Sequence, residues 1–182
     1  MTQAVTPALS PYEAEPFFQA GFELHERLHL LARTIDEEPP APTHRLRRGR
    51  PWDRSRVLDV DGKAFEEFWR FDSLSLKEAR RATPVHRFQV AIASGRVSGY
   101  AVTGRAGGRG YLQRLAVDPQ LKGQGIGTSL VNDCLRWLHG KGVGMALVNT
   151  QERNRRALDL YERLGFVQQR DGLLVLRWDA PA

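Results

Sequence analysis

The stretch from Leu115 to Leu130 constrains this chain most, because in it an apolar strand end runs through a glycine-rich turn into an amphipathic helix. The glycines of the turn, Gly123, Gly125 and Gly127, lack the Cβ atoms that would keep a ligand away from the backbone. The first N–H groups of the helix have no partner within the helix and lie at the positive end of its dipole. The sequence therefore predicts a turn that binds a phosphate or pyrophosphate.

The spacing of the turn excludes two common kinds of phosphate loop. A Walker loop ends in Gly-Lys-Ser/Thr, whereas Lys122 precedes the glycines here. The dinucleotide-binding pattern Gly-x-Gly-x-x-Gly needs a third glycine where this chain has Thr128. A different class of phosphate-binding protein is therefore indicated.

Two segments in the expected order resemble the GCN5-related N-acetyltransferase family. The first is Lys122-Gly123-Gln124-Gly125-Ile126-Gly127, which is similar to the family pattern Gln/Arg-x-x-Gly-x-Gly/Ala with Lys122 keeping the positive charge. The second runs from Asn154 to Phe166 and is similar to the pattern Asn-x-x-Ala-x-x-x-Tyr-x-x-x-Gly-Phe. An apolar strand pattern follows it, and the resemblance covers about residues 42 to 178.

The resemblance implies an α/β (α+β) fold, a three-layer αβα sandwich around a mixed, centrally splayed β-sheet of the GNAT type. The chain itself divides into an N-terminal helix-strand extension at residues 1–36, a proline-rich linker at 37–42 and an acetyltransferase domain at 43–182. Apolar spacing predicts a strand at 43–50, a helix from a cap at Asp53 to about Arg70, and a second helix opened by a capping box at Ser75.

Later apolar patterns predict the remaining elements of the domain. Strands are expected near 88–92, 97–102, 111–117, 145–148 and 173–178, and helices at 127–139 and after Asn154. In the 111–117 strand the inward residues Leu112 and Leu115 are three apart, and period two resumes only afterwards. This spacing predicts a β-bulge.

The N-terminal extension contains an echo of the C-terminal segment. When Gly21 is set on Gly165, Phe17 meets Tyr161, Leu30 meets Leu174 and Arg33 meets Arg177. Residues 12–35 are therefore predicted to form a helix end, a turn and a strand, and they resemble the tail of a degenerate acetyltransferase module without a glycine turn. A chance match on an ordinary helix-strand pair is the alternative. Residues 1–11 show no periodicity and are expected to form a loose tail.

The resemblance assigns site residues for acetyl-coenzyme A (acetyl-CoA). The glycine turn would hold the pyrophosphate, a backbone N–H near Arg114 or Leu115, freed by the bulge, would polarise the thioester carbonyl, and Tyr161 would be the general acid. The catalytic set is Tyr161 and Leu115. The cofactor-binding set comprises Leu115, Ala116, Val117, Lys122, Gly123, Gln124, Gly125, Ile126, Gly127, Thr128, Asn154, Ala157 and Tyr161. Asn154 could instead be a plain helix cap. Tyr161 could instead have no chemical role and serve only to pack against Phe166.

Candidates for contact with the acceptor substrate are Glu66, Trp69, Phe71 and Asn149. For the aromatic residues, a position facing the core is an equally good interpretation. In family members that acetylate protein N-termini, an acidic residue at the position of Asn149 often serves as the base, and an amide cannot take the proton. Glu152, Glu66, His86 or a chain of water molecules could replace it, and the sequence does not choose among them.

Composition excludes several other classes. Cys134, the single cysteine, allows no disulfide and no thiolate metal cluster within the chain, and its helical stripe favours a packed thiol over a nucleophile. No metal site is expected. No apolar run has the length of a membrane span and no signal-peptide pattern is present, which predicts a cytoplasmic protein without a membrane partner. The net charge of +6 suits phosphate groups, and no nucleic-acid partner is expected.

Three classes of function remain open from the sequence. The leading one is an acetyl-CoA-dependent N-acetyltransferase that acts on a primary amine of a small molecule or a peptide. A non-catalytic acyl-CoA-binding sensor is the second, favoured by Asn149 and opposed by Tyr161. The third is an adaptor that recruits a partner through the N-terminal extension, and a homodimer is possible in each case.

Overall fold

The computed structural model describes residues 3–180, and the chain forms two compact units. The first unit joins the residues up to Arg33 to those from Val148 onward, and the second runs from Thr34 to Leu147. Each unit has its own strands and helices.

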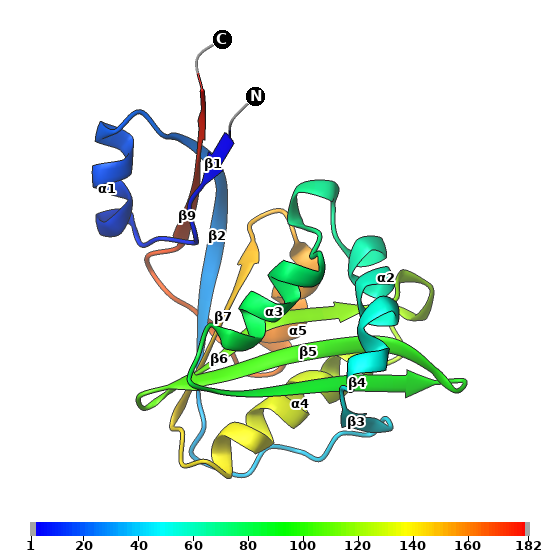
Figure 1. Ribbon diagram of the computed structural model, residues 1–182. Helices are drawn as coiled ribbons and strands as arrows, with labels where there is room; N and C mark the ends of the chain where they lie inside the picture. Colours follow the sequence, from blue (N-terminus) through cyan, green and yellow to red (C-terminus); the bar gives the residue numbers. More distant parts are fainter. Residues whose placement is uncertain (1–2, 181–182) are drawn as a thin grey trace. The chain divides into compact units, whose positions relative to one another are not determined.

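An antiparallel sheet with the strand order β3-β4-β5-β6 forms the centre of the second unit. Helices α2 and α3 pack on one face of this sheet and α4 on the other (Figure 1). The strands are β3 (Leu46–Arg48), β4 (Val85–Ala93), β5 (Arg96–Ala106) and β6 (Arg109–Val117). The helices are α2 (Arg54–Ala64), α3 (Ser73–Arg81) and α4 (Ile126–His139), with short 3₁₀ turns at Pro51–Asp53, Glu67–Trp69 and Pro119–Leu121.

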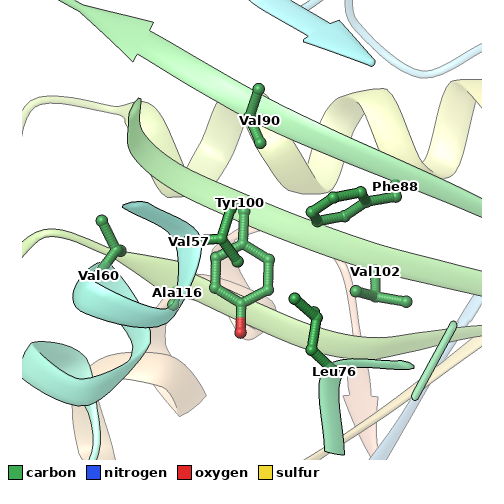
Figure 2. Close-up of a cluster of buried hydrophobic side chains, with 8 residues drawn as sticks. All are labelled: Val57, Val60, Leu76, Phe88, Val90, Tyr100, Val102 and Ala116. Carbon is green, nitrogen blue, oxygen red and sulfur yellow. The ribbon is translucent and has the colours of Figure 1, made fainter. Parts of the chain in front are cut away.

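The apolar core of the second unit lies between the sheet and helices α2 and α3. Figure 2 shows side chains of both helices against inward-facing side chains of β4, β5 and β6. They are Val57, Val60, Leu76, Phe88, Val90, Tyr100, Val102 and Ala116. On the opposite face the sheet approaches α4 closely, because a Cβ added to Gly110 would lie 2.4 Å from a methyl carbon of Leu138.

The first unit contains strands from both ends of the chain. Strand β2 (Glu23–Thr34) pairs in antiparallel fashion with β9 (Leu173–Asp179) through its first half and with β8 (Val167–Gln168) through its second half. Strand β1 (Gln3–Val5) pairs with the other edge of β9, and α1 (Pro11–Gln19) packs on β9 (Figure 1). The unit is completed by α5 (Arg155–Arg163) and by the end of β7 (Met145–Gln151), which crosses the boundary between the units.

Several predicted element boundaries are wrong. Residues 3–5 form strand β1 where a loose tail was expected, and the strand expected at 43–50 shrinks to β3. Asp53 does not cap α2 with its side chain, because its carboxylate instead accepts two hydrogen bonds from Arg47 and one from the Arg50 N–H. Helix α3 begins at Ser73, where Asp72 accepts the Ser75 N–H, so Ser75 is not the cap.

A buried carboxylate connects α2 to the sheet and to the segment that follows the helix. Asp61 is fully buried and accepts two hydrogen bonds of 2.8 Å from the Arg114 guanidinium on β6. The Tyr100 hydroxyl donates to the same carboxylate at 2.5 Å, and the Phe71 N–H donates to it at 2.6 Å. Burial raises the pKa of Tyr100 far above its usual value, and the neighbouring Asp61 charge raises it further, so this phenol remains a hydrogen-bond donor.

The Tyr100 hydroxyl is expected to stabilise the second unit measurably. Tyr100→Phe keeps the ring in the core cluster and removes only the O–H that Asp61 accepts, so the free energy of unfolding should fall by about 1.5–3 kcal/mol, the usual range for a hydrogen bond to a charged group. Urea unfolding measures the change. Tyr111→Phe, the same chemical change on β6, is the matched control and should cost less than about 0.5 kcal/mol. An equal effect of the two substitutions would contradict the assigned contact.

Candidate functional site

The glycine turn has the backbone conformation that an anion cradle requires. Strand β6 ends at Val117, and Asp118 then accepts the Gln120 N–H at 3.0 Å and closes the 3₁₀ turn. Gly123 has φ 83° and Gly125 has φ 84°, in the left-handed region that residues with a Cβ seldom adopt. Helix α4 begins at the next residue, Ile126, so the turn leads directly into its N-terminal N–H groups.

His44 lies beside this turn. A Cβ built on Gly125 would be 3.3 Å from the His44 Cε1 atom. The imidazole Nδ1 of His44 is 2.9 Å from the Ser129 hydroxyl in the first turn of α4, and the Thr43 N–H donates to the same hydroxyl. These contacts hold the segment before β3 against the start of α4. Strand β3 therefore begins later than the sequence predicted.

The predicted bulge is present in β6. Val102 of β5 pairs with Arg114, whereas the next residue, Thr103, pairs with Leu112, so Gln113 has no counterpart on β5. The irregularity falls directly before Arg114 and Leu115, the positions where the resemblance implies a backbone donor. Leu115 is half-buried and pairs with Ala101.

The acceptor-side candidates on the second unit differ in their surroundings. Glu66 is exposed, whereas Phe71 is half-buried and packs against the core cluster. The Arg114 guanidinium stacks on Phe71, with its Cζ atom 3.9 Å from the ring centroid, and donates to the Trp69 carbonyl at 2.6 Å. The backbone of this segment is therefore held by Arg114 and Asp61, and Phe71 has a structural role in it.

Helix α5 holds the second predicted motif. Asn154 is the N-cap, and its side chain accepts the Ala157 N–H at 3.1 Å. The residue therefore caps α5, and its contact with the cofactor stays a prediction. The Tyr161 side chain is 5 % exposed, and its ring centroid lies 5.7 Å from that of Phe166. This packing orients the ring, and it does not by itself assign the hydroxyl.

No single candidate for the general base stands out. Asn149 is exposed on β7, and its neighbour Thr150 is buried. Glu66 and Glu152 are both exposed. His86 is half-buried at the start of β4, where burial and then the charges of Arg80 and Arg48 hold its pKa below the usual value. The His86 imidazole is therefore neutral at physiological pH.

Cys134 has the surroundings of a packed core thiol. The side chain is 1 % exposed within α4, and burial raises its pKa to about 12. A thiol with this pKa is almost entirely protonated near neutral pH and is a poor nucleophile. Among residues 3–180, no group of three or more His, Cys, Asp or Glu side chains could hold a metal ion. None of the helices in this range combines the length and the apolar character that a membrane span needs.

Sequence reasoning missed two functional neighbours. Asp61 follows Val57 by one helical turn on the buried side of α2, and a carboxylate at such a position indicates a buried cationic partner, although not that the partner is Arg114. His44 lies beside Gly125 through a contact between residues far apart in the chain, and no local pattern signals it.

Comparison with solved structures agrees with this fold. A GCN5-related N-acetyltransferase from Sphaerobacter thermophilus matches with a TM-score of 0.67 at 21 % identity, covering 97 % of this chain and 60 % of that one. The PaiA N-acetyltransferase from Thermoplasma acidophilum, solved in complex with coenzyme A, matches with a TM-score of 0.64 at 14 % identity, covering 76 % of this chain and 99 % of that one. The predicted mixed α/β fold with a splayed mixed sheet is confirmed.

Comparison of sequences defines the family. Residues 54–166 match the Acetyltransferase (GNAT) family, and the chain belongs to this family. A curated relative, the mycothiol acetyltransferase of Saccharomonospora viridis, is 32 % identical over 161 residues, which cover 78 % of this chain and 53 % of the relative. The chain thus spans about half the length of the curated relatives that it matches.

Proposed function

We propose that this chain is an acetyl-CoA-dependent N-acetyltransferase that transfers an acetyl group directly to a primary amine. The observation that carries the proposal is the turn before α4, in which Gly123 and Gly125 both have positive φ and lead into free helix N–H groups. Such a turn recognises a pyrophosphate through the backbone. The family membership and the named acetyltransferase relatives support the same activity.

The residues present fit the cofactor. The turn residues from Lys122 to Thr128 would hold the pyrophosphate, with the exposed Lys122 adding a positive charge. Leu115, Ala116 and Val117 would also contact the cofactor, and Asn154 would hydrogen-bond the pantetheine arm, as the resemblance implies. The Thermoplasma acidophilum protein shares the fold and was solved in complex with coenzyme A, which supports coenzyme A as the kind of cofactor.

Acetyl-CoA would supply the activated thioester carbonyl. The protein would supply a hydrogen-bond donor to the carbonyl oxygen, an acid for the thiolate and a route for the amine proton. A backbone N–H after the bulge at Gln113 would donate to the carbonyl oxygen as the amine nitrogen bonds to the carbonyl carbon. The Tyr161 hydroxyl would give its proton to the thiolate that departs as the carbon–sulfur bond breaks. The amine would lose its own proton to solvent or to one of the candidate bases, Glu66, His86 or Glu152, and solvent would reprotonate Tyr161.

The acceptor is an amine of a small molecule or a peptide. Exposed carboxylates at Glu66 and Glu67 lie next to Trp69, and such a combination suits an ammonium group bound to an apolar body. The curated relatives are named for mycothiol, so amines related to mycothiol are included among the acceptors to be tested. The homodimer stays a prediction.

Incubation of the full chain with acetyl-CoA and a panel of amines tests the function. The panel contains mycothiol-related amines, peptides with free N-termini, polyamines and aminoglycosides, and release of the coenzyme A thiol is the measurement. At least one amine should release thiol and gain one acetyl group per thiol. Tight binding of acetyl-CoA without thiol release from any amine would support the sensor, which the exposed Asn149 favours.

A further inference from the structure

The first unit contains two similar segments, an N-terminal copy around α1 and a C-terminal copy around α5. Equivalent residues of the two copies differ in number by a constant amount. Helix α5 spans Arg155–Arg163 and α1 spans Pro11–Gln19, so 155 minus 11 and 163 minus 19 both give 144. The same separation relates their N-caps, because Ser10 accepts the Glu13 N–H as Asn154 accepts the Ala157 N–H. Two helices of equal length with caps at equal places indicate one repeated segment.

The turns after the two helices are also alike. Gly21 has φ 87° and Gly165 has φ 77°. The Phe22 N–H donates to the Phe17 carbonyl at 3.0 Å, and the corresponding Phe166 N–H donates to the Tyr161 carbonyl at 3.0 Å. The two aromatic pairs have similar centroid separations, 5.4 Å for Phe17 with Phe22 and 5.7 Å for Tyr161 with Phe166. Thr6 and Thr150, also 144 apart, are each 7 % exposed.

The strand of each copy pairs with a strand of the other copy. Leu24 of β2 pairs with Leu176 of β9. Shifting Leu24 up by 144 gives Gln168, and shifting Leu176 down by 144 gives Ala32. The structure pairs Gln168 with Leu31 and Val167 with Ala32, within one residue of this expectation. The first unit therefore has an approximate internal twofold relation, in which each copy's strand pairs with the other copy's.

The N-terminal copy lacks the groups that chemistry would need. Phe17 stands where the other copy has Tyr161 and carries no hydroxyl. Glu13 stands where the other copy has Ala157, and its carboxylate accepts hydrogen bonds from the Ser10 N–H and hydroxyl at 2.8 and 2.7 Å. These bonds lower the Glu13 pKa, so the start of α1 already holds a negative charge.

One residue of the N-terminal copy reaches the helix that carries Tyr161. The Arg33 guanidinium donates from Nη1 to the Leu164 carbonyl at 2.5 Å, at the C-terminus of α5. Its side chain also packs over the turn, with Nε 3.8 Å from a Cβ built on Gly165. A cation at a helix C-terminus is favoured by the helix dipole, and here it fixes the turn whose N–H groups bind the Tyr161 carbonyl. The equivalent Arg177 instead pairs with Asp179 at the surface.

We propose that residues 3–34 are an inactive copy of residues 147–178, and that Arg33 of the inactive copy is a positioning residue for Tyr161. The N-terminal segment then supports the helix that carries Tyr161 and is not a dispensable tail. The effect of Arg33 on catalysis rests on the proposed function, because it requires Tyr161 to be the acid. The contact between Arg33 and α5 does not depend on that function.

A double-mutant cycle tests the positioning role with the best acceptor of the amine panel. Arg33→Met should lower kcat roughly tenfold, since small displacements of a reacting group are costly, and should leave the KM for acetyl-CoA within about twofold. In a Tyr161→Phe background the same substitution should change kcat by less than about twofold, because the misplaced hydroxyl is already absent. Arg33→Lys should recover part of kcat, and Arg177→Met is the matched control without effect on kcat. Full additivity of the two substitutions would overturn the positioning role.

Amide hydrogen exchange provides a readout that needs no acceptor. Arg33→Met should speed the exchange of the Gly165 and Phe166 amides on the order of tenfold, whereas Arg177→Met should leave both unchanged. If no amine in the panel is acetylated, the proposed function fails while this measurement still decides whether Arg33 holds the end of α5. Unchanged exchange in Arg33→Met would overturn the inference in either case.

Discussion

Gly125→Asp is expected to abolish acetyl-CoA binding within the measurable range. The new carboxylate would stand at the turn that receives the pyrophosphate. Two unit charges roughly 4 Å apart repel by about 4 kcal/mol at an effective dielectric constant of about 20. That energy corresponds to a loss of about 1000-fold in affinity. Calorimetric titration of the variant with acetyl-CoA measures the change.

Gly125→Asn is the matched control for this charge. Gly125 has φ 84° and the His44 ring is close, so any side chain at this position strains the turn. Asparagine and aspartate have nearly the same shape, and both tolerate the left-handed region better than most residues. Asn should therefore weaken binding far less than Asp. Equal affinities for the two variants would show that no phosphate charge lies at the turn.

Tyr161→Phe is expected to lower kcat by roughly 100-fold or more, since general acid catalysis usually contributes about 100- to 10,000-fold, with acetyl-CoA affinity little changed. The substitution keeps the ring, whose packing against Phe166 fixes the end of α5, and removes only the hydroxyl. Steady-state kinetics with chemistry as the slow step provides the measurement.

The N-terminal copy supplies a control for the loss of a hydroxyl. Phe17 occupies the position equivalent to Tyr161 and packs on Phe22 without any hydroxyl, so this turn does not need one to fold. Tyr161→Phe should accordingly unfold at nearly the wild-type denaturant concentration. An unaltered kcat would show that Tyr161 has only a packing role. A large loss of stability would contradict the comparison with Phe17, and the change in kcat would then not report on the acid.

Features set by neighbouring residues were predicted correctly from the sequence. The three glycines and the apolar stripe predicted a helix from about Gly127, and the structure begins α4 one residue earlier, at Ile126. The bulge in β6 follows from the spacing of Leu112 and Leu115, because one additional residue shifts the inward face. The helix, turn and strand at the N-terminus were recognised because a Gly-Phe turn carries its own conformational signal.

Features set by partners outside the predicted element were not predicted. Asp53 has the composition of a helix cap, yet its carboxylate binds the Arg47 guanidinium, which belongs to the strand before the helix. The helix expected to reach Arg70 ends at Ala64, because Asp61 accepts the Phe71 N–H and turns the chain back. The pair of Asp61 with Arg114 joins residues 53 positions apart, and no local pattern specifies such a partner.

The central claim is that the turn at Lys122 to Thr128 binds the pyrophosphate of acetyl-CoA. Titration of the wild-type chain with acetyl-CoA and, separately, with S-acetylpantetheine tests this claim most directly. The two ligands share the thioester and the pantetheine arm, and only acetyl-CoA has the pyrophosphate. Acetyl-CoA is expected to bind at least about 100-fold more tightly, because only its pyrophosphate can accept hydrogen bonds from the first N–H groups of α4 and pair with Lys122. Equal dissociation constants for the two ligands would contradict it.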